Sequence, residues 1–238
     1  MNLTIARLTM STLFGNRRGL LLFILPGALL ALCVLLALTV DDTADFSTAL
    51  LQMFGLAVIV PLVSLLAATG ALASEIDDGS IVYLLSKPIK RSTIIITKAL
   101  VAIGVILVLA AVPMVVAGLI LDLHDPTTAV AFGIGSLVAG IAYTAIFIAL
   151  SVMSGNAVTI GLIYALLWEG VMGQYVGGAK ALSVQQWSLA VIQNLSDAPH
   201  VKAAVKLPIG IILLAAVVVI GLTLATARLR SHILSTAE

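Results

Sequence analysis

Long apolar runs, almost free of charged residues, alternate with short polar segments along the chain. The runs extend over residues 19–40, 46–74, 99–121, 126–151, 156–176 and 207–227. A helix rises about 1.5 Å per residue, so about 20 residues cross the ~30 Å hydrocarbon core of a bilayer. Because backbone polar groups in lipid need partners within the same segment, each run should be helical. The pattern predicts an all-α, polytopic membrane protein with six transmembrane helices in one domain, residues 1–238.

Two further segments are predicted to lie along the membrane rather than cross it. In residues 1–18, apolar side chains recur at helical spacing, which indicates an amphipathic helix at the cytoplasmic interface. These side chains are Leu3, Ala6, Met10, Leu13 and Phe14. Residues 177–206 form the longest predicted extracellular loop. Within it, residues 183–192 should form a short amphipathic helix, anchored near the lipid headgroups by Trp187.

Composition excludes a soluble globular domain. Hydrophobic residues make up 61% of the 238 residues and charged residues 10%, whereas soluble domains carry about 25% charge. The mean hydropathy is +1.22. The single cysteine, Cys33, lies in the first apolar run and is expected to be a packing residue rather than a reactive thiol.

Basic residues are distributed unevenly between the predicted loops. With the N-terminus in the cytoplasm, the cytoplasmic segments hold Arg7, Arg17, Arg18, Lys87, Lys90, Arg91, Lys98, Arg228 and Arg230. The extracellular side holds only Lys180, Lys202 and Lys206. Cytoplasmic loops of membrane proteins are enriched in Lys and Arg. The distribution therefore predicts a multi-pass protein of the plasma (inner) membrane with both termini in the cytoplasm.

The most polar segment, residues 75–92, lies between the second and third apolar runs. Gly79 can end the second helix because glycine tolerates a left-handed backbone, and Ser80 is suited to cap a new short helix. Pro88 should end that helix. Its apolar face would consist of Ile81, Leu84 and Leu85. The segment predicts a short cytoplasmic helix, parallel to the membrane, whose apolar face needs a partner.

The run from Glu75 to Arg91 reads E-x-x-D-G-S-x-x-x-L-L-S-x-P-x-x-R and resembles the first cytoplasmic loop of permeases of the type 2 ABC exporter family. In that family the loop carries the coupling helix, which docks into the nucleotide-binding subunit. The resemblance implies that the following residues contact an ATPase: Glu75, Asp78, Gly79, Ser80, Ile81, Leu84, Leu85, Pro88 and Arg91. It also implies a permease homodimer, or a pair with a similar permease, working with two copies of a separate ATPase.

The resemblance implies the permease subunit of an ATP-driven exporter, which couples hydrolysis on the ATPase to movement of a cargo. Few charges face any plausible pathway, which favours a hydrophobic or amphipathic cargo. The chain contains no G-x-x-x-x-G-K-[ST] phosphate-binding loop, so it is not expected to be an enzyme alone. ATP and Mg²⁺ are expected on the partner subunit. No cofactor, metal or nucleic acid is expected on this chain, whose remaining partner is membrane lipid.

Glu169 is a carboxylate with long apolar sequence on both sides, and charges at such positions are costly and often functional. Two interpretations remain open. In one, Glu169 lines an extracellular gate or substrate path together with Trp168 and Gln174. In the other, it hydrogen-bonds a re-entrant break in the glycine-containing segment 170–177 and stabilises the turn. The family resemblance favours a break, because the fifth segment of such permeases commonly turns back before reaching the outside.

Two other functions stay open at this stage. An ion-gradient-driven secondary transporter would need paired ionisable groups near the membrane midplane, and Glu169 has no evident pair in the sequence. A non-transporting membrane subunit of an ATPase complex is the other alternative.

Prolines and small residues within the runs predict local packing. Pro61 and Pro113 can kink the second and third helices. Ser and Thr residues in the runs are expected to hydrogen-bond their own helices. Close helix approach is expected in the fourth run at Gly133, Gly135 and Gly140.

Overall fold

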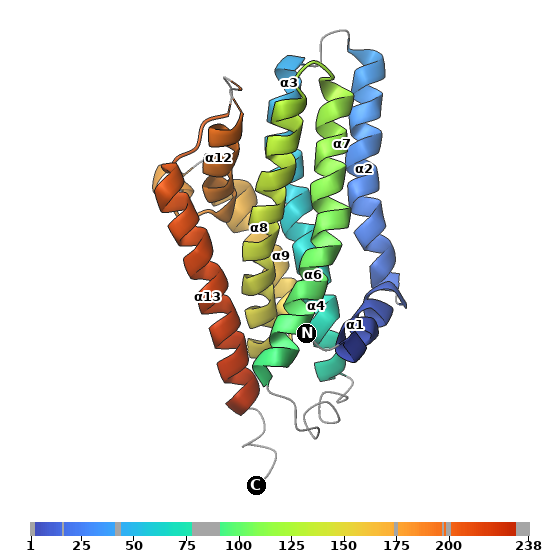
Figure 1. The fold of residues 1–238 in the computed structure, drawn as a ribbon, viewed down its shortest axis with the longest axis vertical. Helices are drawn as coiled ribbons and strands as arrows, with labels where there is room; N and C mark the ends of the chain where they lie inside the picture. The colour runs from blue at the N-terminus through green and yellow to red at the C-terminus, as the bar shows by residue number, and fades with distance from the viewer. Residues whose placement is uncertain are drawn as a thin grey trace.

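The computed structural model describes residues 3–15, 17–40, 44–77, 91–173, 176–196, 198 and 201–231, and all secondary structure in them is helical. The helices are α1 (Leu3–Gly15), α2 (Arg17–Thr39), α3 (Ala44–Leu50), η1 (Leu51–Ile59), α4 (Val60–Asp77), α6 (Arg91–Ile106), η2 (Leu107–Ala111), α7 (Val112–Leu121), α8 (Pro126–Met153), α9 (Ala157–Ile163), η3 (Tyr164–Met172), α11 (Gly177–Lys180), α12 (Val184–Leu195) and α13 (Leu207–Ser231). Elements marked η are π-helical. The long helices run side by side (Figure 1). We call the end with α3 and the α7–α8 turn the distal end, and the end where α6 begins and α13 finishes the basal end.

Five helical segments among the described residues are long and apolar enough to cross a bilayer. They are Gly19–Thr39, Phe46–Leu72, Ser92–Leu121, Pro126–Met153 and Leu207–Leu229. These segments confirm an all-α, polytopic membrane protein. The predicted fifth span is instead the shorter apolar helix Ala157–Met172, which would rise at most about 24 Å at the α-helical rise and so falls short of the ~30 Å core.

The third membrane helix starts earlier than the sequence predicts. The expected span began at residue 99, after Lys98, but α6 begins at Arg91 and the apolar segment at Ser92. Lys98 is therefore about two turns inside the helix, and its side chain is completely buried rather than exposed in a cytoplasmic loop. From sequence alone, a lysine beside an apolar run is assigned to a loop because the sequence does not show whether its side chain is buried.

Helix α8 is the centre of the bundle. In its most apolar stretch 67% of the residues are buried, against 22% in the α2 span and 17% in the α13 span at the two edges (Figure 1). Helices α4, α7, α12 and α13 pack on it. Its predicted glycines are points of close approach, where a Cβ would overlap a neighbouring side chain: Gly133 with Val115, Gly135 with Ile192 and Gly140 with Ile106.

Two of the π-helical segments occur where the sequence predicts kinks. Segment η1 ends two residues before Pro61, and η2 ends two residues before Pro113. Proline has no N–H and its ring clashes with the carbonyl four residues earlier, so it disfavours an ordinary helical turn. The wider π turn relieves this clash without breaking the helix.

Several buried hydroxyl groups in the long helices bond the carbonyl one turn earlier, as predicted. Examples are Ser64 to Val60, Thr69 to Leu65, Ser136 to Phe132, Thr144 to Gly140 and Ser151 to Phe147, all at 2.6–2.7 Å. These groups need no ligand to be satisfied.

Helix α1 packs on α2, α4 and α6 near the basal end. The face turned to the bundle is Ile5, Thr9 and Leu13, and Leu13 lies against Gly70 of α4. Of the apolar residues predicted to share a face, Met10 and Phe14 are instead exposed. The helix is thus apolar on its protein side and partly apolar outside, which suits a helix lying between the bundle and lipid.

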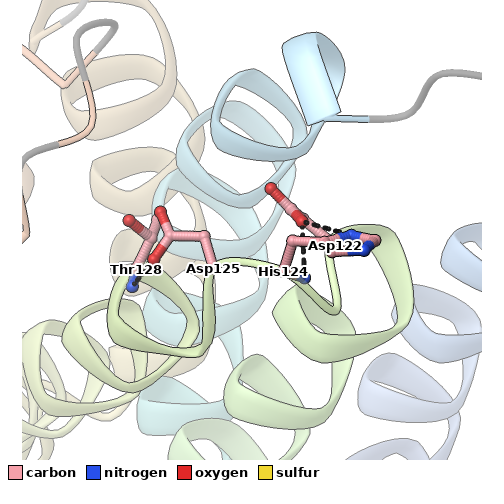
Figure 2. A network of polar contacts seen from close by, with 4 residues as sticks. All are labelled: Asp122, His124, Asp125 and Thr128. Atoms are coloured by element: carbon pink, nitrogen blue, oxygen red, sulfur yellow. Dashed lines mark hydrogen bonds and ion pairs between the residues drawn. The ribbon is translucent and has the colours of Figure 1, made fainter.

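The α7–α8 turn is organised by two aspartates at the distal end (Figure 2). Asp122 Oδ1 accepts the backbone N–H of His124 at 2.9 Å, while the His124 ring is fully exposed. Asp125 caps α8 by accepting the backbone N–H of Thr128 at 3.0 Å, and Pro126 occupies the first helical position. The hydroxyl and backbone N–H of Thr128, both close to Asp125, hold the pKa of that carboxyl below its ordinary value.

Candidate functional site

The carboxylate of Glu169 lies in η3, the last part of the short fifth helix, and is completely buried. Four donors surround it. Oε1 accepts the Tyr164 hydroxyl at 2.9 Å and the Val184 N–H at 3.0 Å. Oε2 accepts the Ser183 hydroxyl at 2.6 Å and the Gln185 N–H at 3.2 Å. All four partners are neutral, and each carboxylate oxygen has two of them.

This arrangement places a carboxylate at the N-terminus of α12. The first N–H groups of a helix have no partner within the helix and carry a partial positive charge, so they bind anions. Ser183 is the N-cap of α12: its hydroxyl accepts from the Gln186 N–H at 3.4 Å while donating to Glu169. Glu169 therefore joins the end of the fifth helix to the start of the next helix.

Gly173 makes the close turn after η3 possible. A Cβ at this position would lie 2.8 Å from the Ser183 hydroxyl oxygen. Any larger residue would push Ser183 away from Glu169. The chain then continues into α11 and α12, and α12 packs between α8 and α13 (Figure 1).

Aromatic side chains close the site on the bundle side. Tyr143, Phe147 and Tyr164 form a row, with ring centroids 6.0 Å apart in the first pair and 6.1 Å in the second. Tyr143 is completely buried, and its hydroxyl makes no hydrogen bond within the described residues. The carboxylate is thus enclosed by protein.

The sequence predicted that Trp187 anchors α12 near the lipid headgroups, but in the structure Trp187 is buried inside the protein. It is 5% exposed, and its indole N–H donates to the Ala181 carbonyl at 2.8 Å. Helix α12 itself is a packed element, because most of its residues are buried against α8 and α13. An aromatic residue fits a headgroup belt or a protein core equally well, so sequence alone could not decide.

A second polar joint lies near the basal end. The Lys98 ammonium of α6 donates to the backbone carbonyl of Ala71 in α4 at 2.5 Å, and both residues are fully buried. The predicted coupling segment connects these two helices in the sequence. Movement of that segment would therefore reach two helices that are already fastened together.

The predicted site residues are only partly within the described residues. Glu75 is in α4 and Arg91 is the first residue of α6. Trp168 lies in η3 next to Glu169 and is half-buried. The following lie outside the described residues: Asp78, Gly79, Ser80, Ile81, Leu84, Leu85, Pro88 and Gln174. Sequence reasoning missed Tyr164, Ser183 and Lys98 as partners, although Ser183-x-x-Gln186 is a capping-box spacing that marks the start of α12.

Comparison with protein families decides the class of the chain. The family model described as ABC-2 family transporter protein matches residues 4–226, nearly the whole sequence. The chain belongs to the ABC-2 transporter family. No curated protein sequence matches it. Membership makes this ABC-2 protein a membrane component of a transporter, in a family whose membrane subunits generally work with ATPase partners.

Proposed function

We propose that this ABC-2 protein is the permease subunit of an ATP-driven exporter. A separate nucleotide-binding subunit would bind ATP and Mg²⁺, and two permease copies would form the membrane body. The observation that carries the proposal is the joint between Lys98 and Ala71, which fastens the two helices that border the coupling motif. Family membership supports the pairing with an ATPase.

Force transfer needs a rigid connection between the ATPase contact and the membrane helices. Helices α4 and α6 both pack on the central helix α8. Because the hydrogen bond from Lys98 to Ala71 joins α6 to α4, a displacement of the coupling segment between these helices would move both of them as one unit against α8. If the two helices could move independently, the same displacement of the loop would not be transmitted to both of them.

Glu169 is proposed to keep the distal end shut. Three of its four hydrogen bonds hold the short fifth helix to the start of α12, so they bridge the elements that would have to separate if a path opened there. This role combines the two interpretations of Glu169, a gate and a hydrogen-bonded structural turn. A path could open here only if the hydrogen bonds that stabilise the turn were broken. The neutral partners give no support to an ion-coupled carboxylate pair.

The proposed cargo is hydrophobic or amphipathic, and the proposed orientation has the basal end in the cytoplasm. The long helices expose many apolar side chains at their surface, including Leu20, Phe23, Ile212 and Val219. A molecule moving along such a surface would need no charged lining. The proposed cellular location is the plasma (inner) membrane.

The direct test is recovery of the ATPase with a tagged permease. Replacing Leu84 by Asp puts a charge on the predicted docking face, which should reduce co-purified ATPase activity at least about tenfold. The matched control is Leu123→Asp, the same change on an exposed leucine of the distal α7–α8 turn. Full recovery of ATPase with Leu84→Asp would contradict the proposed docking face.

A further inference from the structure

The three lysines predicted to be extracellular gather around one segment at the distal side of the bundle. Lys180 and Lys202 line a hollow of about 340 Å³ together with Gln52, Met53, Gln186 and Ala204. Lys206 lines a neighbouring hollow on the other side of the same short segment, Ala203-Ala204. Neither hollow belongs to the Glu169 site.

Two glutamines hold this segment in place. Gln186 Oε1 accepts the Ala204 N–H at 3.1 Å, and Gln193 Oε1 accepts the Ala203 N–H at 2.9 Å. Gln186 is 5% exposed, and its oxygen is committed to the backbone, so its amide N–H₂ group remains as a donor for the hollow that Lys180 and Lys202 line. The hollow is therefore a built site with a fixed, buried donor and two cationic side chains.

The charge around this hollow is positive among the described residues. None of its described lining residues is acidic. Two acidic residues in the described part of the chain are used elsewhere: Asp125 caps α8, and Glu169 is enclosed by its four donors. Ammonium and amide donors on one wall, without a carboxylate, match a phosphate oxyanion.

The position of the hollow points to the lipid surface. Gln52 and Met53 lie within two turns of the start of the span Phe46–Leu72, where a bilayer's headgroup layer meets its hydrocarbon core. Met53 is 56% exposed and provides an apolar rim. A volume of about 340 Å³ is in the range of sites for small organic groups and exceeds what a bare phosphate needs.

We infer that the hollow bounded by Lys180, Lys202, Gln52 and Gln186 binds a phosphate ester anion, namely the headgroup of an anionic phospholipid in the distal leaflet. The two ammonium groups and the Gln186 amide contact the phosphodiester oxygens. Met53 contacts the glycerol and upper acyl chain. The inference concerns the isolated permease and does not depend on the proposed ATPase, so either can fail without the other.

The test is native mass spectrometry of the purified full chain in detergent. It is titrated separately with phosphatidylglycerol, with phosphatidylcholine and with soluble glycerol phosphate. Phosphatidylglycerol should bind about tenfold more tightly than phosphatidylcholine, whose choline cancels the headgroup charge. Binding of glycerol phosphate without phosphatidylglycerol would retain the phosphate chemistry and overturn the lipid assignment.

Variants locate the binding. Lys180→Gln with Lys202→Gln should lower phosphatidylglycerol affinity about tenfold, whereas Lys206→Gln, in the neighbouring hollow, should leave it unchanged. Gln186→Glu keeps an oxygen for the Ala204 N–H but replaces the donor with a negative charge, so it should abolish the preference while the protein stays folded. The inference would be overturned if neither the double lysine variant nor Gln186→Glu changed the affinity for phosphatidylglycerol. Equal binding of the two lipids by the wild type would also overturn it.

Discussion

At the scale of single residues, two charged groups inside the apolar bundle join helices by hydrogen bonds. Glu169 ties the end of one helix to the start of another, and Lys98 ties α6 to α4. The Glu169 carboxylate accepts hydrogen bonds from hydroxyl and backbone N–H donors, and the Lys98 ammonium donates to a backbone carbonyl. Removing one partner of such a buried charge leaves an unsatisfied group, which makes these positions sensitive.

Substituting Glu169 separates its two roles. Glu169→Gln keeps the shape but removes the charge and turns one oxygen into a donor facing donors, so stability should fall by about 3 kcal/mol. Tyr164→Phe removes one of the four hydrogen bonds and should cost about 1 kcal/mol. Thermal unfolding in detergent measures both. A Glu169→Gln protein as stable as the wild type but inactive in transport would show that the residue is not a structural joint.

Lys98 should be equally sensitive. Lys98→Met retains the length of the side chain but loses the bond to Ala71, and we expect a stability loss of about 2 kcal/mol. Lys180→Met, at a half-buried position near the distal end, serves as the control and should change stability by less than about 0.5 kcal/mol. Equal effects of the two substitutions would mean that the basal joint contributes nothing specific.

Asp125 gives a pH-dependent prediction. Because its folded pKa lies below the unfolded value of about 3.9, its charge stabilises the fold above that pH, and the contribution is lost as pH falls through the folded pKa. Asp125→Asn keeps a capping side chain but has no charge to lose. At pH 6 the unfolding free energy of the wild type should therefore exceed that of Asp125→Asn by up to about 1 kcal/mol, and the two should converge at an acid pH below the folded pKa of Asp125. A constant difference at both pH values would contradict this.

At the scale of elements, close packing around α8 sets the shape of the bundle. A Cβ on Gly140 would overlap Ile106, whereas Gly104 of α6 has open space around it. Gly140→Ala should destabilise the protein by about 1–3 kcal/mol, and Gly104→Ala should stabilise it slightly, by up to about 1 kcal/mol. The opposite signs of two identical substitutions, read by thermal unfolding, are the signature of the close contact.

The long helices could be predicted from the sequence because bilayer thickness fixes their length. The spans around α2, α8 and α13 agree with the apolar runs to within a few residues. The helix predicted at residues 183–192 is found as α12, but the short length of the fifth helix and its packing against α12 could not be predicted, since apolar runs do not reveal where a helix turns back. The hydrogen bonds of Glu169 reach residues 14–16 positions later, and no local pattern specifies such a pairing. Lys98 was misplaced because a buried lysine and a loop lysine look alike in sequence.

At the scale of the whole molecule, this ABC-2 protein has a central helix, two peripheral helices and polar joints near opposite ends. The joint at the basal end borders the coupling motif, and the joint at the distal end closes the segment that turns back. We propose that ATP-driven motion enters at the first joint and that release of the second follows. This order requires a direct contact between the segment 78–90 and a separate ATPase.

Site-specific photo-crosslinking tests that contact most directly. A photoreactive phenylalanine analogue is placed at Leu84, and in a control at the exposed Leu123 of the distal turn, in intact membranes containing the transporter. We expect an adduct with a nucleotide-binding subunit from position 84 and none from position 123. An ATPase that co-purifies with the permease but forms no adduct at position 84, or forms it equally at position 123, would contradict the entry of force through this segment.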